Sequence, residues 1–185
     1  MIKFDDLKID EEPSNTIVND SVGDVVLSLK NKESLKCISV ALQKNKNIHF
    51  NTLGYWNFID VVKVVISVIG PCSLYLSSWS ISNNVVMQLS SMKQSGILKE
   101  INGVFDFRIT AHKSNEYTLF KSFANNTILT HNHSKVTLLY NDNWFVTINS
   151  SANATENPRN ECGVISESET VLKHHKNWMD KLIYG

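Results

Sequence analysis

The order of apolar and polar positions along the chain predicts an alternation of strands and helices. A short apolar run at residues 25–29 indicates a strand, and apolar positions three and four residues apart indicate a helix at 33–42. The most apolar stretch, at residues 56–69, is bounded by Gly70 and Pro71 and is predicted to be a buried helix. Strands and helices that alternate favour an α/β layer architecture.

The middle of the chain continues this alternation. Residues 72–79 are predicted to form a buried strand with a serine-rich tip, followed by a helix that stops at Gly96. Residues 104–109 form the next predicted strand, and Ser114 is in position to cap the helix after it. The inward side chains predicted for these two helices are Val85, Leu89, Met92, Tyr117, Phe120 and Phe123.

The last third of the chain is predicted to begin with a β-hairpin. Two strand-like runs at residues 127–139 and 144–148 flank an Asn-Asp-Asn turn at 141–143. A further strand is predicted at residues 163–165 and a closing helix at 169–183. The inward side chains predicted for this helix are Val171, His175, Trp178 and Leu182.

Length and composition predict a folded protein with one main domain. The chain has 185 residues, of which 42% are hydrophobic and 19% charged, the ordinary balance of a soluble protein. We expect residues 1–45 to be an N-terminal extension packed on or preceding the domain, and residues 46–185 to form that domain. The 18 basic and 18 acidic residues cancel, so any nucleic acid must bind a local patch.

Cysteine spacing and hydropathy favour a cytoplasmic protein without a metal site. The three cysteines, Cys37, Cys72 and Cys162, are an odd number and lack zinc-ligand spacing, so neither a disulfide framework nor a metal site is indicated. Residues 1–13 lack the apolar core of a signal peptide, and the apolar run at 58–69 is too short to span a membrane. We expect a protein of the bacterial cytoplasm. Its abundant asparagine is associated with AT-rich genomes such as those of many phages.

Side chains suited to phosphoryl transfer gather in the predicted hairpin. His133 and Lys135 are two positions apart on a predicted strand, so they are expected to point to the same face. The returning strand ends in a loop that contains Ser150, Ser151 and Asn153, whose hydroxyls and amide can come back toward His133. The set supplies a nucleophile, a fixed cation and neutral hydrogen-bond donors, which are the parts that phosphoryl transfer needs.

These residues resemble the hallmark of the phospholipase-D-like superfamily. That hallmark is H-x-K, four residues, D, then G-S-x-N or G-S-x-x-N and a later acidic residue. The chain has HSK at 133–135, SSAN at 150–153 and NPRNE ending at Glu161, in the same order and at similar spacing. A strand with the sequence CSLYLSSWS leads into a helix, as in the family, and the resemblance covers roughly residues 72–161.

Two positions depart from this hallmark. Tyr140 stands where the family has its aspartate, and Asp142 follows two residues later in the turn. Ser150 stands where a glycine is usual. The sequence leaves open whether a hairpin lengthened by two residues brings Asp142 into an equivalent role.

The resemblance implies a fold and a mechanism. The fold would be a mixed β-sheet flanked by helices on both faces, a phospholipase-D-like half-domain, and a chain with one motif would need a homodimer to complete a site. His133 would attack phosphorus to form a phosphohistidine, and the matching histidine of the second copy would protonate the leaving oxygen. Lys135 and Asn153, helped by Ser151, would hold the phosphate, and Glu161 would orient and polarise the imidazole. No metal or other cofactor is implied.

Other polar residues are candidates for substrate binding or for plain structural roles. His131 is expected to flank the site, whereas His174 and His175 cannot chelate a metal together because adjacent helix residues point about 100° apart. Trp79 is as readily explained by core contacts as by a place in the site. The candidate substrate-binding residues are Ser150, Ser151, Ser80, Trp79 and Arg159. The cations that could frame a phosphate-rich groove, although such a scattered set is typical of solvated surface, are Lys44, Lys46, Arg108, Lys113 and Arg159.

Three functions compete for this sequence. The first is a homodimeric, metal-independent phosphodiesterase that cleaves DNA or RNA, as single-motif members of the superfamily often do. The second is a catalytically weakened relative that binds nucleic acid or a partner protein, which the missing aspartate and the zero net charge favour. The third is a true phospholipase, but no amphipathic membrane-binding face is evident in the sequence. We prefer the first because the polar residues occur in the order that the hallmark requires.

Overall fold

The computed structural model describes residues 17–19, 24–28, 35–156 and 159–185. The described strands are β1 (Ile17–Asn19), β2 (Asp24–Ser28), β3 (Asn47–Asn51), β4 (Cys72–Ser78), β5 (Leu98–Asp106), β6 (Asn126–Thr130), β7 (Val136–Tyr140), β8 (Phe145–Ser150) and β9 (Cys162–Glu167). The described helices are α1 (Leu35–Ala41), α2 (Phe58–Ile69), α3 (Asn83–Gln94), α4 (Ile109–His112), α5 (Ser114–Phe123) and α6 (Glu169–Tyr184).

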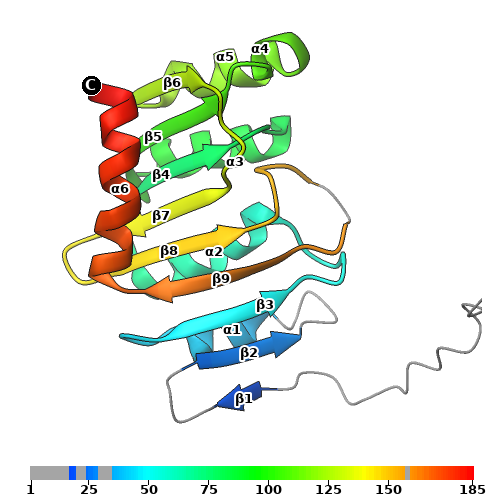
Figure 1. Ribbon diagram of the computed structural model, residues 1–185, viewed down its shortest axis with the longest axis vertical. Helices are drawn as coiled ribbons and strands as arrows, with labels where there is room; N and C mark the ends of the chain where they lie inside the picture. The colour runs from blue at the N-terminus through cyan, green and yellow to red at the C-terminus, as the bar shows by residue number, and fades with distance from the viewer. Residues whose placement is uncertain (1–16, 20–23, 29–34, 157–158) are drawn as a thin grey trace, which may run out of the picture.

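The described strands form one mixed sheet of nine strands in the order β1-β2-β3-β9-β8-β7-β4-β5-β6. Strands β4, β5 and β6 run parallel, and β4, β7, β8, β9 and β3 alternate in direction. Helices α1, α2, α3 and α5 lie on one face and α6 crosses the other (Figure 1). The predicted α/β fold, a mixed sheet with helices on both faces, is confirmed.

Helix α2 is the most apolar element, and its ends are fixed by local hydrogen bonds. The Asn57 side chain accepts hydrogen bonds from the backbone N–H groups of Ile59 (3.2 Å) and Asp60 (3.4 Å), and the Asp60 carboxylate accepts one from the Asn57 N–H (3.1 Å). This capping box satisfies N–H groups that a first helical turn leaves unpaired. At the other end Gly70 has a φ of 77°, which favours glycine. The predicted helix at 56–69 is confirmed, with its start two residues later.

The predicted strand at residues 127–139 is wrong, because the structure divides it into two. Strand β6 pairs with β5 at the sheet edge, whereas β7 lies between β4 and β8. The five-residue loop between them, 131–135, contains Asn132, whose buried amide donates to the carbonyls of Ser78 (3.3 Å) and Val104 (3.1 Å). The amide thus joins backbone of β4 and β5 and interrupts the strand pattern. The predicted β7–β8 hairpin is confirmed.

Two other strand predictions need correction. Strand β5 was expected at 104–109, but it begins at Leu98 and ends at Asp106. It ends there because the Asp106 carboxylate accepts a hydrogen bond from the backbone N–H of Arg108 (3.0 Å), which turns the chain. Strand β3 was not predicted at all. It is short, and only its alternate residues Ile48 and Phe50 are buried.

The helix predicted after Ser114 and the helix predicted at 169–183 are both present, but details differ. Lys113 is the N-cap of α5 and Ser114 is its first helical residue. In α6 the buried side chains are Leu172 and Met179, each one position after a residue predicted to face inward, and Leu182 is exposed. The helix is therefore rotated by about one residue, or 100°, from its predicted orientation.

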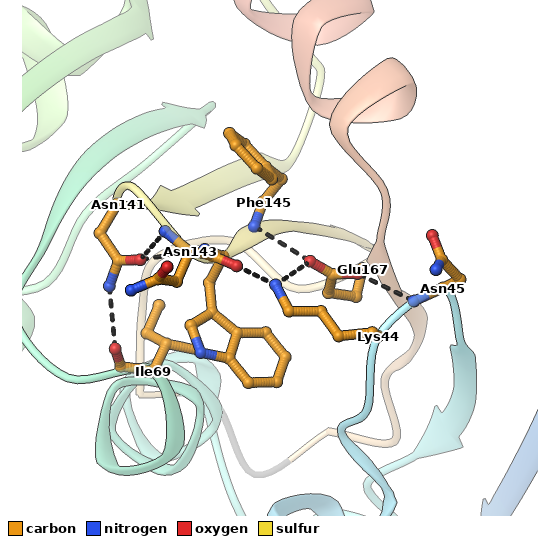
Figure 2. Close-up of polar contacts among 8 residues, drawn as sticks. Lys44, Asn45, Ile69, Asn141, Asn143, Phe145 and Glu167 are labelled. Carbon is orange, nitrogen blue, oxygen red and sulfur yellow. Dashed lines mark hydrogen bonds and ion pairs between the residues drawn. The ribbon is translucent and has the colours of Figure 1, made fainter.

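The sheet end that carries the β7–β8 turn is held by buried polar contacts (Figure 2). The Glu167 carboxylate, 4% exposed, accepts hydrogen bonds from Lys44 Nζ (3.0 Å) and from the backbone N–H groups of Asn45 (2.9 Å) and Phe145 (3.3 Å). In the turn, the Asn141 amide donates to the carbonyl of Ile69 (2.8 Å). These contacts tie the hairpin to α2 and to the loop before β3.

Candidate active site

At the opposite end of the sheet, β4, β5, β6 and β8 end and β7 and β9 begin (Figure 1). A shallow groove lies there, between the start of β7 and the end of β8. The backbone N–H of Ser150 donates to the carbonyl of Lys135 (3.2 Å), which fixes the end of β8 beside the start of β7. Four predicted site residues share this groove. Its lining consists of His133, Lys135, Ser150 and Ser151 together with Ser134, Val136 and Asn149.

His133 and Lys135 meet, although the predicted reason is wrong. Both precede β7, in the loop at 131–135, so strand alternation does not bring them together. Instead the Lys135 side chain folds back, donating from Nζ to the His133 carbonyl (2.8 Å). Its Nζ then lies 3.4 Å from His133 Nδ1 and 3.5 Å from Nε2. The imidazole is exposed and the ammonium half-buried, so one ligand can reach both.

The environment of Lys135 is suited to holding an anion. Partial burial lowers the pKa of its ammonium, and the negative charge of Glu161 opposes that shift. A cation that has lost part of its hydration attracts a bound anion more strongly than one in open water. The lysine therefore supplies a fixed positive charge next to the imidazole.

Asn132 anchors the backbone on the N-terminal side of His133. Its amide donates to Ser77 Oγ (3.0 Å) as well as to the two strand carbonyls described above. Its side-chain oxygen accepts hydrogen bonds from the N–H (3.1 Å) and Oγ (2.6 Å) of Ser134. The residues on both sides of His133 are thus tied to each other and to β4, which fixes the loop that presents the imidazole.

A buried carboxylate supports the same loop. Asp106 is 1% exposed and accepts hydrogen bonds from the backbone N–H of Asn132 (3.2 Å) and from Arg108 Nε (2.6 Å). The hydrogen bond from the Arg108 guanidinium holds the pKa of this carboxyl well below its usual range. Sequence reasoning missed both Asp106 and Asn132. A signal for Asp106 is available, since it is a charged residue at the carboxyl end of a buried parallel strand, where functional groups commonly gather.

Glu161 lies beside the groove, but it contacts Ser151 rather than the imidazole. The Ser151 hydroxyl donates a short hydrogen bond to the Glu161 carboxylate, and the described residues contain no hydrogen bond between Glu161 and His133. Two hydrogen bonds with Thr52 fix the Glu161 backbone. The Glu161 N–H donates to Thr52 Oγ1 (2.9 Å), and the Thr52 N–H donates to the Glu161 carbonyl (2.8 Å). The carboxylate therefore orients Ser151 and acts on Lys135 through its charge.

Asn153 and Glu161 line a second, small pocket that adjoins the groove. Ser150 belongs to the lining of both, so the two hollows are continuous at that residue. The Asn153 side-chain oxygen is buried and has no hydrogen-bond partner among the described residues. The rest of the lining is mixed and includes the apolar Phe50 and Trp56 and the polar Thr52 and Asn57. The predicted phosphate-binding set is therefore divided between an open groove and a partly closed pocket.

The remaining predicted residues lie around this centre. Ser80 is in the loop after β4, where its carbonyl accepts from Ser78 Oγ (2.7 Å). Trp79 lies under the Arg108 guanidinium, with 5.5 Å between the Arg108 carbon and the ring centroid. Arg159 is exposed, and its carbonyl accepts from Thr52 Oγ1 (3.1 Å). None of these three residues is part of the groove lining.

Comparison with solved structures identifies the fold. The crystal structure of Nuc, a phospholipase D family member from Salmonella typhimurium, aligns with a TM-score of 0.57 and 15% sequence identity, over 74% of this chain and 93% of Nuc. The chain has the phospholipase-D-like fold. A polyphosphate kinase from Porphyromonas gingivalis aligns less well, with a TM-score of 0.41 and 16% identity over 60% of this chain and 18% of the kinase. No protein-family model and no curated protein matches the sequence.

Within the phospholipase-D-like fold, the position of the missing aspartate lies far from the groove. Tyr140 ends β7 and Lys135 precedes its start, and five residues of strand span roughly 16 Å. The Tyr140 ring lies near that of Tyr75 (centroids 6.2 Å apart), and burial raises its pKa to about 12. Asp142 is in the exposed turn beyond. The lengthened hairpin therefore does not bring Asp142 to the groove, and a carboxylate at either position is too distant to touch a phosphate held by Lys135.

No three His, Cys, Asp or Glu side chains among the described residues gather closely enough to hold a metal ion. None of its described helices is long and apolar enough to cross a membrane. On α6, the rings of His174 and His175 meet edge to face, with their centroids 5.2 Å apart. His175 Nδ1 accepts a hydrogen bond from Trp178 Nε1 (3.1 Å).

Proposed function

We propose that this chain is a metal-independent phosphodiesterase that cleaves DNA or RNA through a phosphohistidine on His133, in a site completed by a second copy of the chain. One observation carries the proposal. The Lys135 ammonium lies within 3.5 Å of both ring nitrogens of an exposed imidazole, in an open groove whose lining includes Ser150 and Ser151. A nucleophile beside a fixed cation and neutral donors is the arrangement that phosphoryl transfer requires.

The reaction proceeds in two displacements. A ring nitrogen of His133 attacks phosphorus, the bond from phosphorus to the leaving oxygen breaks, and that oxygen takes a proton from the protonated imidazole of the second copy. The second imidazole, now neutral, accepts a proton from water. The resulting hydroxide attacks phosphorus, the phosphorus–nitrogen bond breaks, and His133 and a phosphomonoester are released. Lys135 stabilises the charge on the non-bridging oxygens, and Ser150 donates to them. Ser151 donates as well once its hydroxyl turns from Glu161 to the phosphate.

A second copy is needed because the described residues supply one imidazole to the groove, and the mechanism uses two. Two copies related by a two-fold axis bring their grooves face to face through an isologous interface. Asn153 then completes the set from the adjoining pocket, where its buried side-chain oxygen has no hydrogen-bond partner among the described residues. Arg159, Ser80 and Trp79 lie around the groove and contact the flanking parts of a polymeric substrate.

Cleavage in EDTA tests this function. Purified chain is incubated with labelled DNA, labelled RNA and the small phosphodiester bis(p-nitrophenyl) phosphate, beside His133→Ala. His174→Ala is the matched control, since it removes an exposed histidine from α6, away from the groove. We expect cleavage that persists in EDTA, is abolished by His133→Ala and is unaffected by His174→Ala. Equal activity of the wild type and His133→Ala would contradict the assignment.

One observation favours the alternative, a weakened relative that binds nucleic acid or a partner without turnover. Glu161 is hydrogen-bonded to Ser151, so His133 lacks the carboxylate partner that would orient and polarise its imidazole. If this alternative is correct, labelled DNA or RNA binds in a manner that depends on Lys135, and none of the three phosphodiesters is hydrolysed.

A further inference from the structure

An exposed aromatic and cationic cluster lies next to the groove and is not used by the chemistry described above. Phe107 and Arg108 follow β5, and His131 follows β6. Because β4, β5 and β6 are parallel, the loops that follow them lie at the same end of the sheet as the groove (Figure 1). We call Phe107, Arg108 and His131 the flanking cluster.

The two rings of the flanking cluster are exposed and already arranged against each other. Phe107 is 44% exposed, although a phenylalanine on a well-packed domain is usually buried. Its ring meets the exposed His131 ring edge to face, with centroids 4.7 Å apart and planes at 74°. An open face of Phe107 bounded by a second ring is a surface on which a flat aromatic group can stack.

Asp106 holds one edge of the Arg108 guanidinium, and the rest of the guanidinium is exposed to solvent. Its Nε and Nη2 donate to the two oxygens of Asp106 (2.6 and 3.2 Å). The guanidinium carbon lies 5.8 Å from the Phe107 ring centroid, and the side chain is 51% exposed. Arginine is well suited to bind phosphate, since its planar fork presents several N–H donors in fixed directions. Here the carboxylate of Asp106 occupies the Nε and Nη2 edge, which orients the guanidinium and leaves its Nη1 side to a ligand.

The flanking cluster is connected to the catalytic loop through the backbone. The N–H of Phe107 donates to the carbonyl of Thr130 (3.0 Å), and the N–H of Asn132 donates to Asp106 (3.2 Å). His131 is two residues from His133, so their Cα atoms are at most about 7 Å apart. The flanking cluster therefore lies close to the place where Lys135 and His133 meet, since His131 contacts Phe107.

We propose that Phe107, Arg108 and His131 form a subsite that binds one nucleobase and the adjacent phosphate of a single-stranded nucleic acid, beside the phosphodiester held by His133 and Lys135. The base stacks on Phe107 against the edge of His131, and Arg108 binds the neighbouring phosphate. The inference rests on the proposed function and deepens it by naming the class of substrate.

Single strands fit this subsite better than duplexes. The bases of a duplex are stacked on one another, so a base must be unpaired before it can lie on Phe107. Stacking on an aromatic ring accepts any base, so the subsite gives affinity without sequence preference. The chain also has a formal net charge of zero, so it lacks the broad excess of positive charge that draws proteins onto duplex DNA.

Fluorescence anisotropy with a fluorescein-labelled oligodeoxythymidylate tests the subsite. The measurement is made in EDTA on the full chain and, to keep the probe intact, also in a His133→Ala background. We expect Phe107→Ala to weaken binding by roughly 5- to 150-fold, the range for loss of one base–aromatic stack. Phe107→Trp is expected to bind at least as tightly as the wild type, and Phe107→Leu to bind weakly, since leucine has no ring.

Tyr184→Ala is the matched control. Tyr184 is an aromatic residue of similar exposure, 61%, at the opposite end of the sheet, where its hydroxyl accepts from the Asn126 amide at the start of β6 (3.1 Å). We expect this variant to bind like the wild type. His131→Ala keeps the test available if Phe107→Ala does not fold, and it is expected to weaken binding by a smaller factor.

The inference is overturned if Phe107→Ala binds the probe like Tyr184→Ala, if Phe107→Leu binds as well as Phe107→Trp, or if a duplex of the same length binds as tightly as the single strand. These outcomes are measured by binding alone and do not depend on whether the chain cleaves a phosphodiester. His133-dependent hydrolysis of bis(p-nitrophenyl) phosphate decides the proposed function, and a chain that hydrolyses it without discriminating single strands has the function but not the subsite.

Discussion

The two ends of the β-sheet use polar side chains in opposite ways. At the end drawn in Figure 2, Glu167 and Asn141 are buried or half-buried and bonded to backbone groups and to Lys44. At the other end, His133 is exposed beside Lys135, and the buried Asn153 oxygen has no partner among the described residues. Satisfied polar groups stabilise a fold, whereas open ones are retained where a ligand completes them. One end of the sheet therefore stabilises the fold, and the other is the end to which the proposed function assigns the chemistry.

Substituting Lys135 should have the largest effect at the chemical end. We expect Lys135→Ala to lower kcat/KM for phosphodiester hydrolysis by about 10²- to 10³-fold, because a charge that stabilises the transition state is removed. The free energy of unfolding should change little, since the side chain is half-buried beside the open groove. Steady-state kinetics and urea unfolding measure the two quantities on the same sample. A large loss of stability would place Lys135 with the structural residues instead.

The pH profile sharpens the assignment of Lys135. Anion binding in the groove uses the protonated ammonium, and partial burial lowers its pKa from the ordinary value of 10.5. The affinity for inorganic phosphate, measured by titration calorimetry, should therefore decline on the alkaline side with a midpoint below 10.5, as the lysine loses its proton. Lys135→Arg should remove this decline, because arginine stays charged throughout. A decline of the same midpoint in Lys135→Arg would show that another group is responsible.

Substituting Glu167 should have the reverse effect. Glu167→Ala removes the acceptor of two backbone N–H groups and of Lys44. We expect the free energy of unfolding to fall by about 1–3 kcal/mol, the usual cost of leaving buried donors unpaired. The value of kcat/KM should stay unchanged for the folded fraction. If Glu167→Ala lowers kcat/KM as much as Lys135→Ala does, the division between the two ends of the sheet is contradicted.

Asp106 belongs to the chemical end but contributes to both properties. Its pKa is lowered from 3.8, chiefly by the hydrogen bond from Arg108, so its stabilising effect is complete well above pH 3.8 and is lost as the pH falls below that value. Asp106→Asn should lower the free energy of unfolding by about 1–2 kcal/mol near neutral pH and reduce its dependence on acid. Urea unfolding across the acidic range measures this. An unchanged acid dependence would contradict the role of the carboxylate.

Tyr140→Asp places an aspartate where the phospholipase-D-like hallmark has one and should have little effect on activity. The position is roughly 16 Å from Lys135 along β7, so a carboxylate there cannot contact the substrate. We expect kcat/KM to stay within about twofold of the wild type, as for most changes distant from a site. Stability should fall, because the new charge replaces a ring packed near Tyr75 and faces Asp180 and Glu100. A large gain in activity would show that the aspartate acts on the chemistry.

The sequence predicted the layers of the fold because local patterns determine them. The apolar segment of α2 with its glycine stop and the turn of the β7–β8 hairpin are signals carried by adjacent residues. The division of 127–139 into two strands depends on Asn132, which bonds to Ser77, Ser78 and Val104. Those partners are 28 to 55 residues away in the chain, so no local pattern contains this information.

Four of the candidate site residues lie together, but the contacts between them are not those that the sequence predicted. His133, Lys135, Ser150 and Ser151 share one groove, as the motif order suggested. Lys135 reaches His133 by folding back from a loop, and Glu161 contacts Ser151 in place of the imidazole, because side-chain rotamers and loop paths set these contacts. The supporting carboxylate of Asp106 was missed, since its partners are brought to it only by the parallel arrangement of β5 and β6.

Trapping the covalent intermediate tests the central claim most directly. The chain is mixed with a labelled phosphodiester in EDTA, quenched in alkali, where phosphohistidine survives, and digested for peptide mapping. The account predicts a phosphoryl adduct on His133 and, in His133→Ala, neither adduct nor turnover. Turnover with the label on a different side chain, or undiminished turnover by His133→Ala, would contradict it.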